Sequence, residues 1–587
     1  MGLLSRSSSS SDDLEKRPKF TKRDSQLSIH TQDYALGIRK SNPYSNIDDL
    51  TPTALAEGHQ LKKDLKTRHI TMIAIGGALG TGLLIGTTSA LATAGPASIL
   101  IAYSIVGLVV YFVMCCLGEM ASFIPLPEGF AGYATRYCDE ALGFGVGIAY
   151  LCKYLIIAPN QLVAGSLVMQ YWLSPAKVNP GVWIAIILVI VILINLFGVK
   201  FFGEFEFWLS SLKVITVLGL IILLLCIMLG GSPTHDRIGF RYWQDPGAFA
   251  PYKKIDNKPL AKFVSFWSVM VTAVFAYLGT ELVGITFGEA QNPRHTIKKA
   301  IRLTFYRILI FYICSVFLIG CCVAYNDPQL LAAKKSTATA SASPFVVAIK
   351  NANIDGLPHV INACILIFIF SATNSDLYIA TRNLYGLSAN GMLPKIFSKT
   401  NKNGVPIYSL AFAASFCLLA FMACSSSSKE VFNYFVKVVS ILGLLTWISI
   451  LVTYLYFLKA VKAQGYNRKR DFVYYAPLQP YGAWIALFIC CLIAITKNFT
   501  VFIHGFEYKS FITGYIGIPI YLIAIFGWKI IKKTKTVKPE EADLVTYKDV
   551  IDAETEEFER LEAEKVAERN GKKDASWWYD HSIGYVF

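Results

Sequence analysis

Charged side chains are scarce through most of this chain. Positions 69–528 carry 49 Lys, Arg, Asp and Glu residues in 460 positions, about 11%, whereas a typical soluble domain carries about 25%. This composition excludes a water-soluble fold for that stretch. The excess basic residues behind the net charge of +15 lie between apolar runs rather than along a polar domain, so they do not indicate nucleic-acid binding.

The sequence motifs of ATP-driven pumps, voltage sensors and carbonyl selectivity filters are missing as well. No G-x-x-x-x-G-K-[ST] loop is present, which excludes an ATP-driven pump. No apolar run carries the regularly spaced arginines of a voltage sensor, and no carbonyl-filter motif occurs. The eight His residues are scattered, and most of the 13 Cys lie inside apolar runs, which is typical of small buried side chains. We therefore expect no metal, no cofactor, no disulfide framework and no enzyme activity.

Apolar segments long enough to cross a bilayer, which takes ~20 residues, fill the middle of the chain. They predict an all-α membrane protein with twelve transmembrane helices. We expect a disordered tail over 1–68, a helical core over 69–533 and a charged tail over 534–587. The predicted spans are 70–93, 97–123, 142–172, 181–199, 206–230, 263–288, 304–325, 358–388, 406–424, 431–458, 480–497 and 511–531.

The distribution of Lys and Arg predicts the orientation. An even number of spans puts both termini on one side of the membrane, and four basic clusters fall on that side. Because cytoplasmic loops carry the excess of Lys and Arg, we expect both tails in the cytoplasm. The loop 231–262 is also basic and opposes this orientation, but it is long and contains acidic residues too. The four clusters lie within 62–68, 294–302, 459–470 and 529–533.

The two tails differ from the core in composition. Residues 1–68 are rich in Ser, Lys and Asp and contain no apolar stretch of a signal peptide, which predicts a disordered segment. A regulatory tail that carries phosphorylation and lysine modification is the alternative. In the other tail, residues 540–568 predict a charged amphipathic helix, and S-W-W-Y at 576–579 is expected to pack at the membrane surface. We expect trafficking or ubiquitination machinery to bind these tails.

Glycine interrupts two predicted spans at corresponding places. The first span contains I-G-G-A-L-G-T-G-L-L-I-G (75–86), and the sixth contains F-A-Y-L-G-T-E-L-V-G (275–284). A continuous transmembrane helix satisfies all its own backbone groups, whereas a break frees N–H groups for a carboxylate and carbonyls for an ammonium. Close helix packing through small residues is the alternative, but paired interruptions are the pattern of a transporter binding site.

Few ionisable side chains lie inside the predicted spans, and each is costly there unless it is paired or hydrated. A structural ion pair, or snorkelling to the interface, is the alternative role for each of them. Lys213 and Glu281 lie too deep to snorkel easily, and buried groups of this kind can load and release protons near neutral pH. The full set is Glu119, Lys153, Lys213, Glu281, Glu289, Asp376 and Lys437.

Longer motifs make the chain recognisable from about 69 to 533. It resembles the fungal amino-acid permeases of the amino acid–polyamine–organocation superfamily, and within them it is most similar to the dicarboxylic amino acid permeases of yeasts, which import aspartate and glutamate with protons. The resemblance implies two inverted five-helix repeats (70–230 and 263–458) plus two further helices (480–531), in the plasma membrane. The motifs include H-x-x-M-I-A-I-G-G-A-L-G-T-G-L-L-I-G (69–86), L-G-E-M (117–120), G-F-A-G-Y-A-T-R-Y (129–137), F-G-E-F-E-F-W-L-S-S-L-K-V (202–214) and E-A-Q-N-P-R-H-T-I-K-K-A-I-R (289–302).

The same resemblance implies roles for residues at the two breaks. One triplet of residues in the first span matches the backbone that holds the substrate α-carboxylate in these relatives. Three backbone carbonyls, one in the first span and two in the sixth, match those that face the substrate α-ammonium. Phe275 also matches an aromatic gate, and Gly279 belongs to the same substrate-binding break. Glu281 matches a glutamate that links binding to gating, and Lys213 matches a proton switch of related bacterial members. The triplet is Gly80, Thr81 and Gly82, and the carbonyls belong to Ala78, Phe275 and Leu278.

The third span departs from many relatives. Permeases for neutral or basic amino acids often have a glutamate where this chain has Gln161, beside Asn160. A pocket without that carboxylate suits an anionic substrate, because like charges at close range repel by several kcal/mol at low dielectric. Both residues are therefore expected at the site, and Lys437, or failing that Lys153, is expected to face the side-chain carboxylate of the substrate.

These observations predict proton-coupled import of amino acids by alternating access. Spans 1 and 6 would rock against spans 3, 4, 8 and 9, while Lys213 and Glu281 change protonation. Acidic amino acids are the expected substrates and protons the coupling ion. The alternatives are a permease for neutral or many amino acids, a permease-like nutrient sensor that signals through its tails, and a channel.

Overall fold

The computed structural model describes residues 79–568, except 127, 197–198, 254, 283, 285–292, 336–342, 402–403, 426 and 504. The predictions for residues 1–68, Ala78, Glu289 and 576–579 lie outside the described residues. Within the described part the chain forms helices and turns without strands. The helices are η1 (Gly82–Gly86), α4 (Thr87–Ala94), α5 (Pro96–Phe123), α6 (Gly129–Tyr137), α7 (Glu140–Met169), α8 (Pro180–Leu196), α9 (Val199–Leu229), η2 (Trp243–Gly247), α10 (Lys258–Ser268), α11 (Met270–Tyr277), α13 (Pro293–Arg307), η4 (Ile308–Cys314), α14 (Ser315–Cys322), α15 (Pro328–Lys335), α16 (Pro344–Asn351), α17 (Leu357–Ala389), η5 (Lys395–Ser398), α18 (Ile407–Cys417), η6 (Leu418–Cys424), α19 (Ser428–Ala463), α20 (Arg468–Asp471), α21 (Tyr481–Thr496), η7 (Phe499–Phe502), α22 (Tyr508–Tyr515), α23 (Gly517–Lys532) and α24 (Lys548–Glu568).

The described helices support a multi-pass membrane protein. Nine helical stretches are long and apolar enough to cross a bilayer, and the pair α22 and α23, bent by 41°, makes a tenth. The two remaining predicted spans coincide with shorter apolar helices, Gly82–Ala94 and Pro180–Leu196. The all-helical architecture is therefore confirmed for the described residues, whereas the number of twelve spans stays a prediction.

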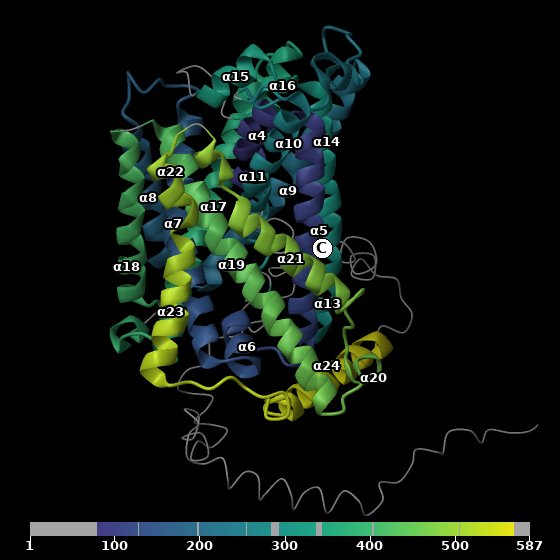
Figure 1. Ribbon diagram of the computed structural model, residues 1–587, viewed down its shortest axis with the longest axis vertical. Coiled ribbons are helices and arrows are strands. Elements are labelled where there is room, and N and C mark those ends of the chain that lie inside the picture. The colour runs from purple at the N-terminus through teal and green to yellow at the C-terminus, as the bar shows by residue number, and fades with distance from the viewer. Residues whose placement is uncertain are drawn as a thin grey trace, which may run out of the picture. The chain divides into compact units, whose positions relative to one another are not determined.

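Two long helices, α5 and α7, each pack against several others. Helix α7 packs against α17, α19 and α23, while α5 packs against α11, α13 and α21 (Figure 1). Peripheral helices turn large apolar side chains outward, which suits contact with lipid tails. Examples are Trp208 and Ile215 on α9, Phe488 on α21 and Ile523 on α23.

Helix ends follow local sequence signals. Asp139 precedes α7, and its carboxylate accepts a hydrogen bond from the N–H of Ala141, which is the usual capping interaction. Burial raises the pKa of Asp139, but hydrogen bonds from Lys529 and Thr534 outweigh this effect and hold the pKa below its ordinary value. Gly95, at a φ of +82°, makes the turn between α4 and α5 that other residues rarely adopt.

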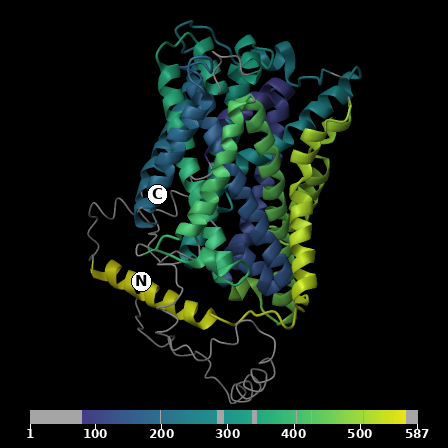
Figure 2. The same cartoon turned by 90° about the vertical axis from the view of Figure 1, so that its left-hand side faces the viewer.

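The C-terminal segment lies against one end of the bundle. Figure 1 shows α24 there with α6 and α20, and the yellow α24 is seen at the same end in Figure 2. Helix α24 begins at Lys548, eight residues later than predicted. Arg294 on α13 donates hydrogen bonds to the carbonyl of Ser122 and, at 2.5 Å, to Asp552. Burial raises the pKa of Asp552, but hydrogen bonds from Lys548 and Arg294 hold it below its ordinary value. These contacts join the tail to α5 and α13.

Candidate substrate site

The predicted break in the sixth span is present in the structure. Helix α11 ends at Tyr277, and Leu278 has extended backbone angles with φ −61° and ψ 145°. Gly279 follows at a φ of +93°, in the region that favours glycine. Turns follow over residues 278–281, and the Glu281 carbonyl accepts a hydrogen bond from the Gly284 N–H. The chain therefore leaves the helix at a glycine of the predicted break.

The first span contributes the second irregular segment. Leu79 and Gly80 are non-helical, Thr81 has helical backbone angles, and the five residues of η1 form one wide helical turn before α4. A Cβ added to Gly82 would lie 2.4 Å from the Cα of Ala276. The two segments thus touch backbone to backbone, which only glycine permits at this position.

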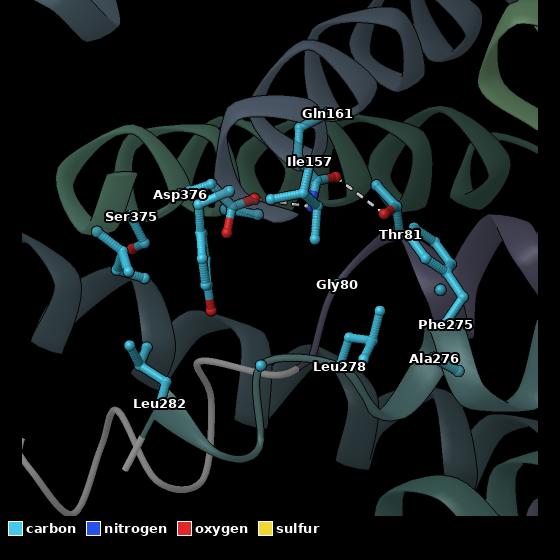
Figure 3. A pocket seen from close by; sticks show the side chains of 15 residues that line it. Gly80, Thr81, Ile157, Gln161, Phe275, Ala276, Leu278, Leu282, Ser375 and Asp376 are labelled. Carbon is cyan, nitrogen blue, oxygen red and sulfur yellow. Dashed lines mark hydrogen bonds between the residues drawn. The ribbon is translucent and has the colours of Figure 1, made fainter. Parts of the chain in front are cut away.

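A cavity lies where these segments meet α7 and α17 (Figure 3). Its volume is about 40 Å³, room for about three water molecules at 10–15 Å³ each. An amino acid is larger than this space, so the elements that line the cavity would have to separate to admit one. The cavity is lined by Gly80, Thr81, Gly82, Tyr154, Ile157, Gln161, Phe275, Ala276, Leu278, Gly279, Leu282, Ala372, Ser375, Asp376 and Ile379.

Three polar side chains are linked along one wall of the cavity. The hydroxyl of Thr81 donates to Gln161 Oε1 at 2.9 Å, and Gln161 Nε2 donates to Asp376 Oδ2 at 3.2 Å. The second carboxyl oxygen of Asp376 points toward the cavity (Figure 3). This chain of hydrogen bonds connects the first glycine break, through α7, to a carboxyl group on α17.

Most of the predicted binding residues gather at this cavity, and some do not. Asn160 lies outside the lining; it is buried, and neither atom of its side-chain amide has a hydrogen-bond partner in the described part of the protein. Tyr154, Ser375 and Asp376 line the cavity although the sequence did not predict them there. For Asp376 a signal existed, namely an ionisable residue inside an apolar run. The predicted residues that do line the cavity are Gly80, Thr81, Gly82, Gln161, Phe275, Leu278 and Gly279.

The two predicted proton-coupling residues lie outside the lining, each in a buried ion pair. Glu281 pairs with Lys153 on α7 and accepts a hydrogen bond from the Trp447 indole at 3.2 Å. Lys213 lies 3.2 Å from Glu206 on the same helix. Both charges are therefore compensated in this conformation.

Lys437 lies away from the cavity in this structure. It does not line the cavity, and its ammonium donates a hydrogen bond to the Ser510 hydroxyl on α22 at 2.8 Å. Lys153, the second choice, is held by Glu281. Neither lysine lines the cavity here, and the expectation that one of them contacts the substrate side chain stays a prediction. The partners of both lysines come from other helices, which the sequence does not reveal.

Comparison with known proteins decides the family. The family model described as amino acid permease matches residues 69–540. The chain belongs to the amino acid permease family. It is a transport protein rather than an enzyme, which confirms that prediction.

Individual permeases of this family cover most of the chain. A dicarboxylic amino acid permease of Saccharomyces cerevisiae is 57% identical over 91% of this chain and 88% of its own length. A proline-specific permease of the same yeast is 40% identical over 82% and 77% of the two chains, and a lysine-specific permease is 39% identical over 85% and 81%. A solved nucleobase-cation-symport-1 family transporter matches at 15% identity, over 88% of this chain and 99% of its own, with a TM-score of 0.45.

Proposed function

We propose that this permease imports acidic amino acids together with protons across the plasma membrane by alternating access. The observation that carries the proposal is the cavity between the two glycine breaks, in a chain 57% identical to a permease named for dicarboxylic amino acids. The proposal includes twelve spans, two inverted repeats of five, cytoplasmic termini, and tails that bind trafficking or ubiquitination machinery.

The backbone at the two breaks supports recognition of an amino acid. The first N–H groups of a helix have no partner within it, and those at the start of η1 border the cavity through Gly80, Thr81 and Gly82. We assign the α-carboxylate to them, since anions bind well at such ends. Carbonyls around Phe275 and Leu278 on the opposite segment are assigned to the α-ammonium.

Transport requires these segments to move. The small cavity volume means that η1 and α11 must separate from α7 and α17 to admit a substrate. We propose that the two broken segments rock against a scaffold containing α7, α8, α17 and α18. Lys213 and Glu281 remain proposed participants in coupling, and each would have to leave its ion pair to exchange a proton.

Uptake measurements test this proposal. In a host that lacks its own amino-acid uptake, labelled glutamate should enter at least about tenfold faster than alanine or lysine, because a site built around a polar group rejects analogues that lack it. Uptake should be faster at pH 5 than at pH 7, and a protonophore should abolish accumulation. Equal rates for glutamate and alanine would indicate a broad permease, and a rate independent of pH would contradict proton coupling.

Replacement of Lys437 gives a narrower test. Because its ammonium contacts Ser510 rather than the cavity, Lys437→Ala should change glutamate and alanine uptake by the same factor. The measurement is the ratio of the two initial rates, normalised to the amount of transporter at the cell surface. A loss confined to glutamate would show that Lys437 reaches the substrate in another conformation.

One observation favours a permease for neutral amino acids as the second candidate. The carboxyl group of Asp376 lines the cavity, although Gln161 stands where many relatives have a glutamate. If Asp376 were ionised, it would repel an anionic side chain at short range. Acidic substrates therefore require that the charge of Asp376 be removed when they bind.

A further inference from the structure

Asp376 differs in charge from the other described residues that line the cavity. Of these fifteen described residues it alone is an Asp, Glu, Lys, Arg or His. It is 9% exposed, and no Lys, Arg or His of the described residues lies within 4.0 Å of its carboxylate to form an ion pair. The Gln161 amide donates a hydrogen bond to it at 3.2 Å. An ionised carboxylate in such a place is poorly compensated.

The charges that surround Asp376 are already balanced against one another. Lys153 on α7 pairs with Glu281, and Lys213 on α9 pairs with Glu206, which also accepts a hydrogen bond from Ser371 on α17. The remaining titratable neighbours in the described part of the chain are thiol and phenol groups. They are Tyr150 and Tyr154 on α7 and Cys417 on α18, whereas α8 and η1 carry no acidic or basic side chain.

Binding of an acidic amino acid changes this balance. A side-chain carboxylate in the cavity would face the second carboxyl oxygen of Asp376 (Figure 3), and two carboxylates at short range cannot both remain ionised. A proton on Asp376 removes the repulsion and turns the group into a hydrogen-bond donor. Proton and substrate then favour each other's binding, and the coupling is reciprocal.

We propose that Asp376 carries the proton that crosses the membrane with each acidic substrate and that its protonated carboxyl donates a hydrogen bond to the substrate side chain. This inference rests on the proposed function. The proton enters from the outside, resides on Asp376 while the substrate is bound, and leaves to the cytoplasm, so that the O–H bond on Asp376 is made once and broken once per cycle. The empty ionised site and the site loaded with one proton and one anionic amino acid have the same net charge.

The same geometry assigns a positioning role to Gln161. Its amide joins the Thr81 hydroxyl, at the proposed α-carboxylate end, to Asp376, at the proposed side-chain end. A substrate with a carboxylate at each end would contact both ends of this series of hydrogen bonds, Thr81 at one end and Asp376 at the other. A neutral substrate would not require a proton on Asp376, so its uptake should depend less on pH.

Asp376→Asn tests the inference, because an amide cannot titrate but keeps the shape of the protonated acid. Purified transporter in lipid vesicles is assayed for glutamate counterflow, for accumulation driven by a proton gradient, and for proton entry with a pH-sensitive dye. The variant should retain counterflow and lose at least about tenfold in gradient-driven accumulation. Its KM for glutamate should stay nearly constant from pH 5 to pH 7, whereas the wild-type KM should rise with pH, by up to about tenfold per unit for one titrating group. Glutamate-dependent proton entry should disappear.

Two comparisons make the result decisive. Asp355→Asn makes the same chemical change in the exposed turn before α17 and should behave as wild type. Counterflow by Asp376→Asn shows that the variant is folded; if counterflow is lost, the KM of Asp376→Glu, which keeps a titratable group, should still rise with pH. Wild-type pH dependence or proton entry in Asp376→Asn, or a flat KM in Asp376→Glu, would overturn the inference alone. Absence of glutamate uptake by the wild type would overturn the proposed function as well.

Discussion

Gly82→Ala should abolish uptake. The added Cβ would lie 2.4 Å from the Cα of Ala276, 3.0 Å from its nitrogen and 3.1 Å from the carbonyl oxygen of Phe275. All three are backbone atoms, so no side-chain rotation can relieve the contact. Overpacking costs about 1–3 kcal/mol or more in a dense interior, and here it would push η1 away from α11. We expect initial uptake rates at background together with a lowered melting temperature of the purified protein.

Two other glycines serve as controls for this change. Gly219 on α9 faces outward, and a Cβ added there would have no atom within 4 Å. Gly219→Ala should therefore keep both uptake and stability, since alanine is favoured by about 0.5–1 kcal/mol within a helix. Gly80 also has open space around it but borders the cavity, so Gly80→Ala should keep the melting temperature and raise the KM for substrate. Normal uptake by Gly82→Ala would show that the two breaks do not have to touch.

The positions of the helices and of the break could be predicted from the sequence because their causes are local. Apolar runs of sufficient length form helices wherever they face lipid or other helices, and each predicted span with described residues overlaps a helix. The end of α11 follows from Leu278 and Gly279, since a positive φ needs glycine. The gathering of Gly80, Thr81 and Gly82 at the cavity follows from the same local signal.

The pairing of side chains between helices could not be predicted. Lys153 and Glu281 are separated by 128 positions and Gln161 and Asp376 by 215, and one sequence carries no record of which helix faces which. Composition indicates that a buried charge needs compensation but not which residue supplies it. Lys437 illustrates the consequence, because its chemistry suited a carboxylate while its position directs it to Ser510.

The start of the C-terminal helix differs from its prediction for a similar reason. Residues 540–568 have helical composition throughout, yet α24 begins only at Lys548. The residues before it use their carbonyls elsewhere: Asp543 and Thr546 accept hydrogen bonds from Arg136 on α6, and Ala542 accepts one from Gln464. Tertiary contacts therefore replace the hydrogen bonds that a longer helix would make.

Lys153→Met should destabilise the folded transporter more than any other single replacement of a charge considered above. Lys153 and Glu281 are both 0% exposed, and removal of one partner leaves the other buried without compensation, which costs about 3–5 kcal/mol. The measurements are the melting temperature in detergent and the fraction of protein that remains monodisperse. The double variant Lys153→Met, Glu281→Gln removes both charges and should recover most of the loss.

The two single replacements should not be equivalent. In Glu281→Gln the remaining ammonium lies over the rings of Tyr150 and Tyr154, at 5.0 and 4.7 Å from their centroids, and each such contact contributes about 0.5–2 kcal/mol. In Lys153→Met the donors that remain to the carboxylate among the described residues are two N–H groups, from Trp447 and from the backbone of Gly279. We therefore expect Glu281→Gln to lower the melting temperature less than Lys153→Met. Equal losses would show that the tyrosine rings do not stabilise the lysine, and no loss in either variant would show that the pair is open to water in the membrane.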